Sequence, residues 1–218
     1  MMQHDVYSDD ISCITAVKQG VMVIWSDQVR DAVDFRVHAA GEQDSVWSPV
    51  ETVASGGKTA DDHINTAMSA DGTLWVATKN SVDALNHPQL VLRVRRPDGL
   101  WTNYPYEPRT TKAEPSRPVV LTTPDRNLVL SGHTVYDKKS PYADRIDFGR
   151  VDTLAPAVSV DQVTVIAPDI SLKVKVNNVT GPKQMFPDDG PWIILASDEK
   201  GNVYESDLKP LFGGKLSK

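Results

Sequence analysis

Short runs of apolar and polar residues follow one another along most of the chain. Val33–His38 alternates apolar and polar side chains, as a strand with one buried face does. Val21–Trp25 is continuously apolar, which is typical of a strand buried on both faces. No stretch of 11 or more residues outside these runs has the apolar spacing of a helix. The pattern therefore predicts an all-β protein.

The predicted strands form a repeat with a period of about fifty residues. Acidic pairs open the first two units, at Asp9-Asp10 and Asp61-Asp62, and Trp25 and Trp75 occupy matching strands 50 residues apart. Each unit contains several short strands joined by tight turns. Units of this length and content are typical of the blades of a β-propeller.

We therefore predict a β-propeller of four-stranded antiparallel blades, in a single domain that spans residues 1–218. It is either a ring of about four blades or the C-terminal half of a larger ring, since propellers contain four to eight blades. A larger ring would be cut open here and would expose strand edges. The predicted units cover residues 8–59, 60–115, 116–176 and 177–211, followed by a frayed tail at 212–218.

Some of the predicted units are less regular than others. Asp71-Gly72 and Asp98-Gly99 mark two hairpins in the second unit. The fourth strand of the first unit is predicted at Val46–Val50, with its proline at a sheet edge. The last unit is predicted to begin with a strand at Thr180–Phe186. Residues 151–176 are predicted to be an irregular region with two strand-like runs.

The bulk composition excludes several classes of protein. The formal net charge of −6 argues against a nucleic-acid binder, which needs a basic face. No apolar run approaches the roughly 20 residues of a membrane-spanning helix, so membrane insertion is not expected. The single cysteine, Cys13, cannot form a disulfide within the chain and is expected to be a buried strand residue. Residues 1–5 lack the pattern of a secretion signal.

Several short phrases are spread over most of Asp9–Leu211, and the most specific is Ala60–Asn65 (Ala-Asp-Asp-His-Ile-Asn). The others are Ser8–Ser12, Val23–Asp27, Phe35–His38, Val46-Trp47, Ala77–Ser81, Arg95–Trp101, Arg117–Leu121 and Leu195–Asp198. With these phrases the chain resembles the C-terminal part of sialidase-like β-propellers, of the Asp-box type, from secreted bacterial proteins of unassigned function. The resemblance implies an extracellular protein and further blades before the position of Met1, in a ring of about six.

The resemblance does not extend to the catalytic pattern of true sialidases. Ser69–Trp75 comes close to the Ser-x-Asp-x-Gly-x-Thr-Trp turn of that family but is one residue short before Gly72. No spacing of the arginines singles out the three that grip a carboxylate in sialidases. No catalytic residue is therefore transferred to this chain.

The acidic pairs precede the first strand of a unit, and in a propeller this strand lines the central channel. Their side chains are expected to converge at one mouth of the channel, where Arg117 holds the matching place in the third unit. Carboxylates at this mouth suit Ca²⁺ or a polyhydroxyl ligand. Alternatively, each aspartate caps its own loop, Arg117 forms a structural ion pair, and His63 is a hydrogen-bonded structural residue. The predicted ligand-binding residues are Asp9, Asp10, Asp61, Asp62, His63 and Arg117.

The leading function predicted from the sequence is a non-catalytic recognition module that binds a carbohydrate or surface glycan at the channel mouth. One alternative is a glycoside hydrolase or lyase on the same scaffold, which needs two carboxyl groups about 5 to 9 Å apart. A second alternative is an assembly protein whose open edge pairs with another chain, either a second copy or a partner that completes the ring.

Overall fold

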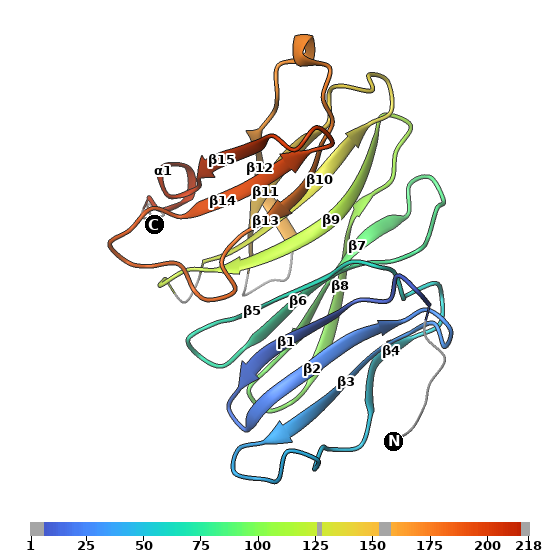
Figure 1. Ribbon diagram of the computed structural model, residues 1–218, viewed down its shortest axis with the longest axis vertical. Helices are drawn as coiled ribbons and strands as arrows, with labels where there is room; N and C mark the ends of the chain where they lie inside the picture. Colours follow the sequence, from blue (N-terminus) through green and yellow to red (C-terminus); the bar gives the residue numbers. More distant parts are fainter. Residues whose placement is uncertain (1–6, 126–127, 153–157, 215–218) are drawn as a thin grey trace.

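The computed structural model describes residues 7–125, 128–152 and 158–214, and in this part the chain forms four antiparallel sheets that follow one another along the sequence (Figure 1). The first sheet contains β1 (Ser12–Val17), β2 (Gly20–Asp27), β3 (Ala32–Ala39) and β4 (Glu51–Ser55); the second contains β5 (Ile64–Met68), β6 (Leu74–Lys79), β7 (Pro88–Arg95) and β8 (Trp101–Pro108). The third contains β9 (Ala113–Thr122), β10 (Val129–Asp137), β11 (Arg145–Val151) and β12 (Val158–Ile166); the fourth contains β13 (Val176–Thr180), β14 (Ile193–Asp198) and β15 (Val203–Asp207). The all-β prediction is confirmed.

Helices are short in the described part of the chain. A 3-10 turn, η1, covers Ile170–Leu172, and a single helical turn, α1, covers Lys209–Phe212. Among the described residues, no helix is long and apolar enough to cross a membrane.

Within each sheet, strands that are neighbours in the sequence are hydrogen-bonded neighbours in space. Tight turns make this order possible. Gly72, Gly99 and Gly201 have φ angles of 87°, 92° and 83°, a left-handed conformation that glycine adopts without a steric penalty. The two Asp-Gly hairpins predicted in the second unit are confirmed by the pairing of β5 with β6 and of β7 with β8.

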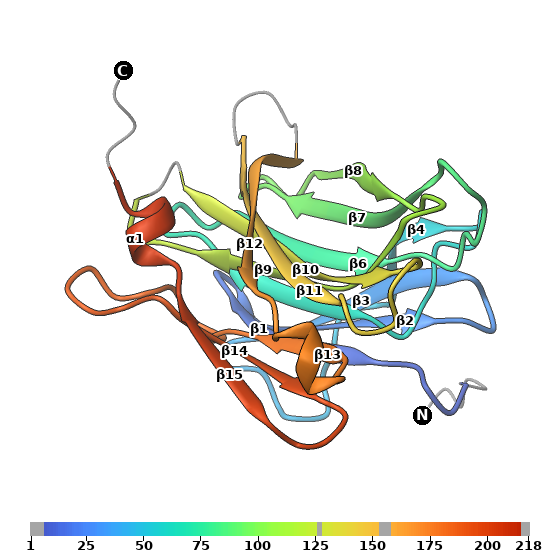
Figure 2. The same cartoon turned by 90° about the horizontal axis from the view of Figure 1, so that it is seen from above.

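The sheets contact one another through their first strands. β1 packs beside β5, β5 beside β9, and β9 beside β13. In Figure 1 the first and fourth sheets lie at opposite ends of the molecule, and in Figure 2 β15 and α1 lie on the other side from β2 to β4. In the described residues no extensive packing joins the first sheet to the fourth, and the structure shows no closed ring.

Three apolar cores hold the sheets together, one between each pair of successive sheets. Tryptophans contribute to these cores, as expected from the large apolar area of an indole. Trp75 is buried between the second and third sheets, and its Nε1 donates to Ser69 Oγ at 2.7 Å. Trp192 is buried between the third and fourth sheets and stacks on Phe186, with 5.6 Å between ring centroids.

The structure differs from the sequence prediction in several segments. The fourth strand of the first sheet is β4 rather than Val46–Val50, where Pro49 has no backbone N–H to donate. The last sheet begins with β13, which ends where Gly181 and Pro182 follow, so Thr180–Phe186 is not a strand. Of the two strand-like runs predicted in the irregular region, Gln162–Ile166 is confirmed as part of β12. The other, Ser171–Val176, is mostly the 3-10 turn η1 and the loop before β13. The predicted frayed tail includes Phe212, which is buried in the last core, whereas residues 215–218 lie outside the described residues.

Gly132 leaves room for an aromatic ring inside the third sheet. It pairs with Phe148 across β10 and β11, and a Cβ atom at this position would lie 2.3 Å from the Phe148 ring. We expect Gly132→Ala to lower the free energy of unfolding by about 1–3 kcal/mol, because the ring is fully buried and has little space to move. Urea unfolding measures this loss.

Gly214→Ala is the matched control, since a Cβ atom there meets nothing within 4 Å. Equal stability of the two variants would contradict the close packing of Phe148 on Gly132.

Candidate functional site

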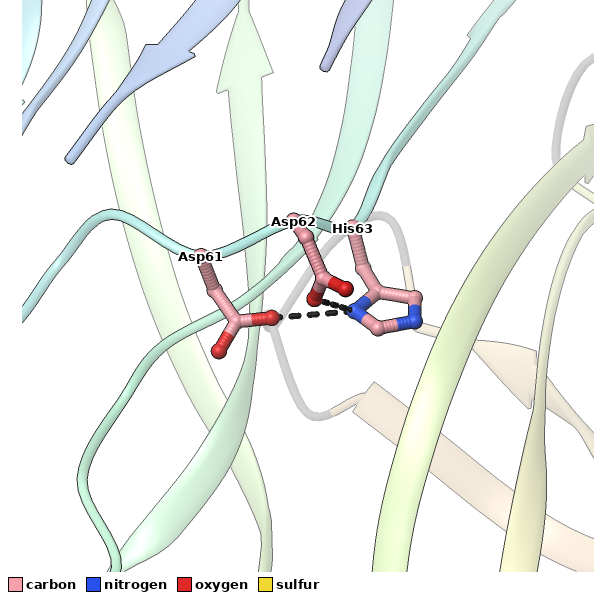
Figure 3. Close-up of side chains that lie close together, drawn as sticks. All are labelled: Asp61, Asp62 and His63. Atoms are coloured by element: carbon pink, nitrogen blue, oxygen red, sulfur yellow. Dashed lines mark hydrogen bonds and ion pairs between the residues drawn. The ribbon is translucent and has the colours of Figure 1, made fainter. Parts of the chain in front are cut away.

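The second acidic pair lies in the segment that leads into β5 and is joined to His63 (Figure 3). The Nδ1 atom of His63 lies 2.9 Å from Asp61 Oδ1 and also contacts Asp62 Oδ1. Asp61 is buried, whereas Asp62 and His63 are half-buried. Both carboxylates therefore approach the same ring nitrogen from the same short segment.

The second oxygen of Asp61 faces the end of β6. Asp61 Oδ2 accepts from Lys79 Nζ at 2.7 Å and from Ser81 Oγ at 3.0 Å. The Ser81 hydroxyl also lies 2.9 Å from the carbonyl oxygen of Ala60. Asp61 thus has hydrogen-bond partners on both of its oxygens.

These contacts set the charge states of the two carboxyl groups. Burial alone would raise the pKa of Asp61, but the hydrogen bonds from His63, Asp62 and Lys79, together with the Lys79 charge, hold that pKa well below its usual range. The pKa of Asp62 is raised, first by burial and then by its hydrogen bond to Asp61. The two neighbouring carboxyls therefore differ in their affinity for a proton.

Arg117 reaches the other side of the His63 ring. Its Nη1 atom lies 3.0 Å from His63 Nε2. A guanidinium can only donate, so in this contact Nε2 accepts and the ring proton sits on Nδ1, which faces the carboxylates. The two contacts thus give the ring nitrogens different roles, with Nδ1 donating and Nε2 accepting.

The backbone at Arg117 is in an unusual conformation. Its φ angle is 52°, in the left-handed region, and Pro118 follows directly. The register of β9 and β10 shifts here, so that Arg117 and Pro118 both stand opposite His133. Such a bulge re-aims a side chain, and a non-glycine residue in this conformation costs about 1–3 kcal/mol. The strain coincides with the residue whose side chain joins the sheets.

Arg117 also contacts the fourth sheet. Its Nε atom donates to Tyr136 Oη at 2.9 Å and to Asn177 Oδ1 at 2.5 Å, and Tyr136 Oη donates to the same Asn177 oxygen. Arg117 lies on β9, Tyr136 on β10 and Asn177 on β13. We call the connected side chains Asp61, Asp62, His63, Lys79, Arg117, Tyr136 and Asn177 the junction network, because they join the second, third and fourth sheets.

A pocket of about 440 Å³ lies beside the junction network, between the third and fourth sheets. Tyr136 and Asn177 belong both to the network and to the pocket wall. The remaining lining residues are mostly charged and of both signs: Asp137, Lys138, Pro141, Asp144, Lys175 and Glu199. Its volume lies in the range of small-molecule sites.

Two carboxyl groups of the pocket have different affinities for a proton. The pKa of Asp137 is lowered by the backbone N–H groups of Ser140 and Lys139. The pKa of Asp144 is raised, chiefly by burial. Asp144 Oδ1 also accepts from the backbone N of Asp137 at 2.9 Å, so the two residues are direct neighbours.

The first acidic pair is used differently from the second. Asp10 accepts from the backbone N atoms of Tyr7, at 2.9 Å, and Gln28, at 3.1 Å. Asp9 Oδ1 accepts from Gln28 Nε2 at 3.0 Å. These bonds connect the segment before β1 to the turn after β2. The first acidic pair therefore caps a loop, as in the alternative interpretation of the sequence. Of the six predicted site residues, the structure joins Asp61, Asp62, His63 and Arg117 in one network, and Asp9 and Asp10 form none of its hydrogen bonds.

The ion pair expected between Arg117 and an acidic pair is replaced by the contact with His63. Among the ion pairs of the described residues, Asp61 is paired with Lys79 rather than with Arg117. The sequence analysis did not predict the contacts of Asp61 with Lys79 and of Arg117 with Asn177, because the partners lie 18 and 60 residues apart in the chain. Lys79 and Ser81 do fall in one of the phrases that define the family resemblance, Ala77–Ser81.

A metal ion fits this group only in part. Asp61, Asp62 and His63 each offer a ligand atom, and these atoms lie within 4.8 Å of one another. Ca²⁺ takes six to eight oxygen ligands, whereas this group supplies two carboxylates and a ring nitrogen. Lys79 also neutralises Asp61 directly. The donor set therefore matches an internally compensated charge network better than a calcium site.

Cys13 has no features of a reactive thiol. Its Sγ atom lies 3.3 Å from the carbonyl oxygen of Ile64, and burial raises the pKa of the thiol. A raised pKa lowers the fraction of nucleophilic thiolate.

Comparison with known proteins adds no identification: no protein-family model matches the chain, and no curated protein matches it. The resemblance to sialidase-like propellers therefore remains a prediction from the sequence.

The low pKa of Asp61 makes stability depend on pH. A carboxyl whose pKa is depressed on folding stabilises the protein above its unfolded pKa of about 3.9, and this stabilisation is lost as the pH falls through the folded pKa. Asp61→Asn also leaves the Lys79 ammonium, only 14% exposed, without its carboxylate. We expect the free energy of unfolding to fall by about 1–3 kcal/mol at pH 7. Below pH 4, we expect the variant to lose less of its stability than the wild-type protein does.

Thermal unfolding between pH 2 and pH 8 measures both effects. Asp83→Asn is the control, since Asp83 pairs with Arg109 but is 70% exposed and should contribute little. If Asp61→Asn and Asp83→Asn had the same pH profile, the charge network around Asp61 would not carry the stability assigned to it.

Proposed function

We propose that the four sheets are successive blades of a β-propeller, open between the first and the last blade. The contacts of β1 with β5, β5 with β9 and β9 with β13 support this, since the first strands of propeller blades line the centre. The meander order within each sheet supports it as well. Under this proposal the junction network lies where three blades meet.

We propose further that the protein is a recognition module that binds a glycan or similar polyhydroxyl ligand in the pocket between the third and fourth sheets. The observation that carries this proposal is the shared wall of pocket and network, formed by Tyr136 and Asn177. A network that orients both residues before binding lowers the entropy that a ligand must lose.

The chemistry of the pocket wall favours a ligand with hydroxyl groups over a ligand whose charges are all of one sign. Lys138 and Lys175 supply donors, and Asp137, Asp144 and Glu199 supply acceptors. A sugar hydroxyl both donates and accepts, so it can use neighbouring groups of opposite charge. A highly charged anion or cation would meet repulsion from one of the two sets.

Lys175 provides the test of the binding site. Its ammonium forms no ion pair with another described residue, whereas Lys138 is paired with Glu114. We expect Lys175→Ala to weaken binding of the tightest glycan by about tenfold, or about 1.4 kcal/mol, through loss of a charged donor. An immobilised glycan panel identifies the probe, and calorimetry measures its affinity.

Lys112→Ala is the matched control, because Lys112 is exposed and does not line the pocket. Binding to no glycan on the panel, or equal affinity of the two lysine variants, would contradict the proposed site. Loss of binding in Asp61→Ala/Asp62→Ala, with the fold retained, would extend the binding role to the acidic pair.

Glycoside hydrolysis is a second candidate function, favoured by the different proton affinities of Asp137 and Asp144. Hydrolysis of a glycosidic bond needs one protonated and one ionised carboxyl group, and environments that shift two pKa values apart supply this pair. Asp144 would act as the acid and Asp137 as the carboxylate. In this case Asp144→Asn should lower the turnover of a bound glycoside at least 100-fold while its affinity stays within a factor of three.

Release of reducing sugar from the glycans that bind measures this activity. No release from any bound glycan by the wild-type protein would exclude hydrolysis and leave the recognition role.

A further inference from the structure

The first sheet has an apolar face that no other sheet covers in the described part of the chain. Met22 and Ile24 of β2 point into the core shared with the second sheet and are fully buried. The intervening residues Val21, Val23 and Trp25 point to the opposite face and keep part of their surface exposed. Alternation along a strand thus gives β2 an apolar side chain on both faces.

The neighbouring strands extend this outer face. Ile14 of β1 pairs with Val23 and is 72% exposed. Arg36 and His38 of β3 pair with Val23 and Val21 and so lie on the same face. The face therefore consists of an apolar strip over β1 and β2, bordered on β3 by Arg36 and His38. Both side chains also contact the loop at residues 46–48, and the buried Asp34 lies further along the same face.

The fourth sheet repeats this arrangement with the opposite charge. Ile194 of β14 is fully buried in the last core, whereas its neighbour Leu195 points away and is 39% exposed. Val203 of β15, on the outer face, is 67% exposed. Glu205 pairs with Leu195, so β15 places an acidic side chain beside the apolar strip.

We propose that two copies of this chain pair through these faces, the first sheet of each copy packing on the fourth sheet of the other. If the first strands meet as they do within one chain, β2 lies opposite β14 and β3 lies opposite β15. The apolar strips then cover each other, and Arg36 and His38 face Glu205. An apolar centre bordered by complementary charge is the composition of a specific protein interface.

The contacts within the chain support this partner over an unrelated one. Each of the three internal cores is formed by the face of one sheet packed on the next. A second copy supplies the same kind of sheet face and, through twofold symmetry, covers both end faces at once. Two copies contribute eight sheets, and eight is within the range of propeller blades. This proposal does not depend on a ligand in the pocket.

Two single substitutions on facing middle strands test the pairing. Val21 and Leu195 are 37% and 39% exposed, so a charge at either position should not disturb the fold of the single chain. We expect Val21→Lys and Leu195→Glu each to raise the dimer dissociation constant at least tenfold in sedimentation equilibrium. Leu85→Lys is the control, since Leu85 is 52% exposed and belongs to the second sheet, in the loop between β6 and β7.

Mixing the two variants distinguishes loss of the interface from loss of the fold. In a mixed dimer one contact is unchanged, and the other brings the two substituted positions together with opposite charges, so dimers should return. Three results would overturn the proposal. They are failure of the mixture to dimerise, unchanged dissociation constants in both variants, and a wild-type protein that stays monomeric up to about 100 μM, which is weaker than micromolar affinity. Growth of the wild-type protein into open-ended polymers would overturn the twofold pairing.

Discussion

The architecture depends on the packing of one sheet face on the next. A sheet with apolar side chains on both faces needs a neighbour on each side, because buried apolar surface stabilises by about 25 cal/mol per Å². The second and third sheets have two such neighbours, and three separate cores result. The first and fourth sheets have one neighbour each within the described chain. The same principle that orders the sheets therefore leaves two faces uncovered.

The polar junction network fixes how three of these sheets meet. Apolar contacts have no preferred direction, whereas hydrogen bonds do. Arg117 contacts His63 from the second sheet and Asn177 from the fourth, while its own backbone is held in a strained bulge. Strain of this kind persists only where the surroundings enforce it. Here it coincides with the residues that shape the neighbouring pocket.

Sequence periodicity predicted the strands with clear alternation or Asp-Gly turns, such as β3 and β5 to β8, because these signals are local. It failed at Val46–Val50 and Thr180–Phe186, where proline and glycine neighbours decide which residues pair. From matching places in the repeat it grouped Asp61, Asp62, His63 and Arg117 with Asp9 and Asp10, and only the first four join one network. It missed Tyr136 and Asn177, which meet Arg117 through a bulge that leaves no repeat signal.

The two acidic pairs show why position in a repeat does not fix function. Asp10 accepts from backbone N–H groups and closes a turn. Asp61 occupies the matching place, but Lys79 and His63 reach it from within the second sheet, and Arg117 from the third sheet extends the chain of contacts. For the first sheet, the place that corresponds to Arg117 falls in the second sheet on the acidic pair itself, which offers Asp9 and Asp10 no guanidinium. The residue that the next sheet supplies, rather than the repeat, therefore decides whether an acidic pair caps a loop or joins a network between sheets.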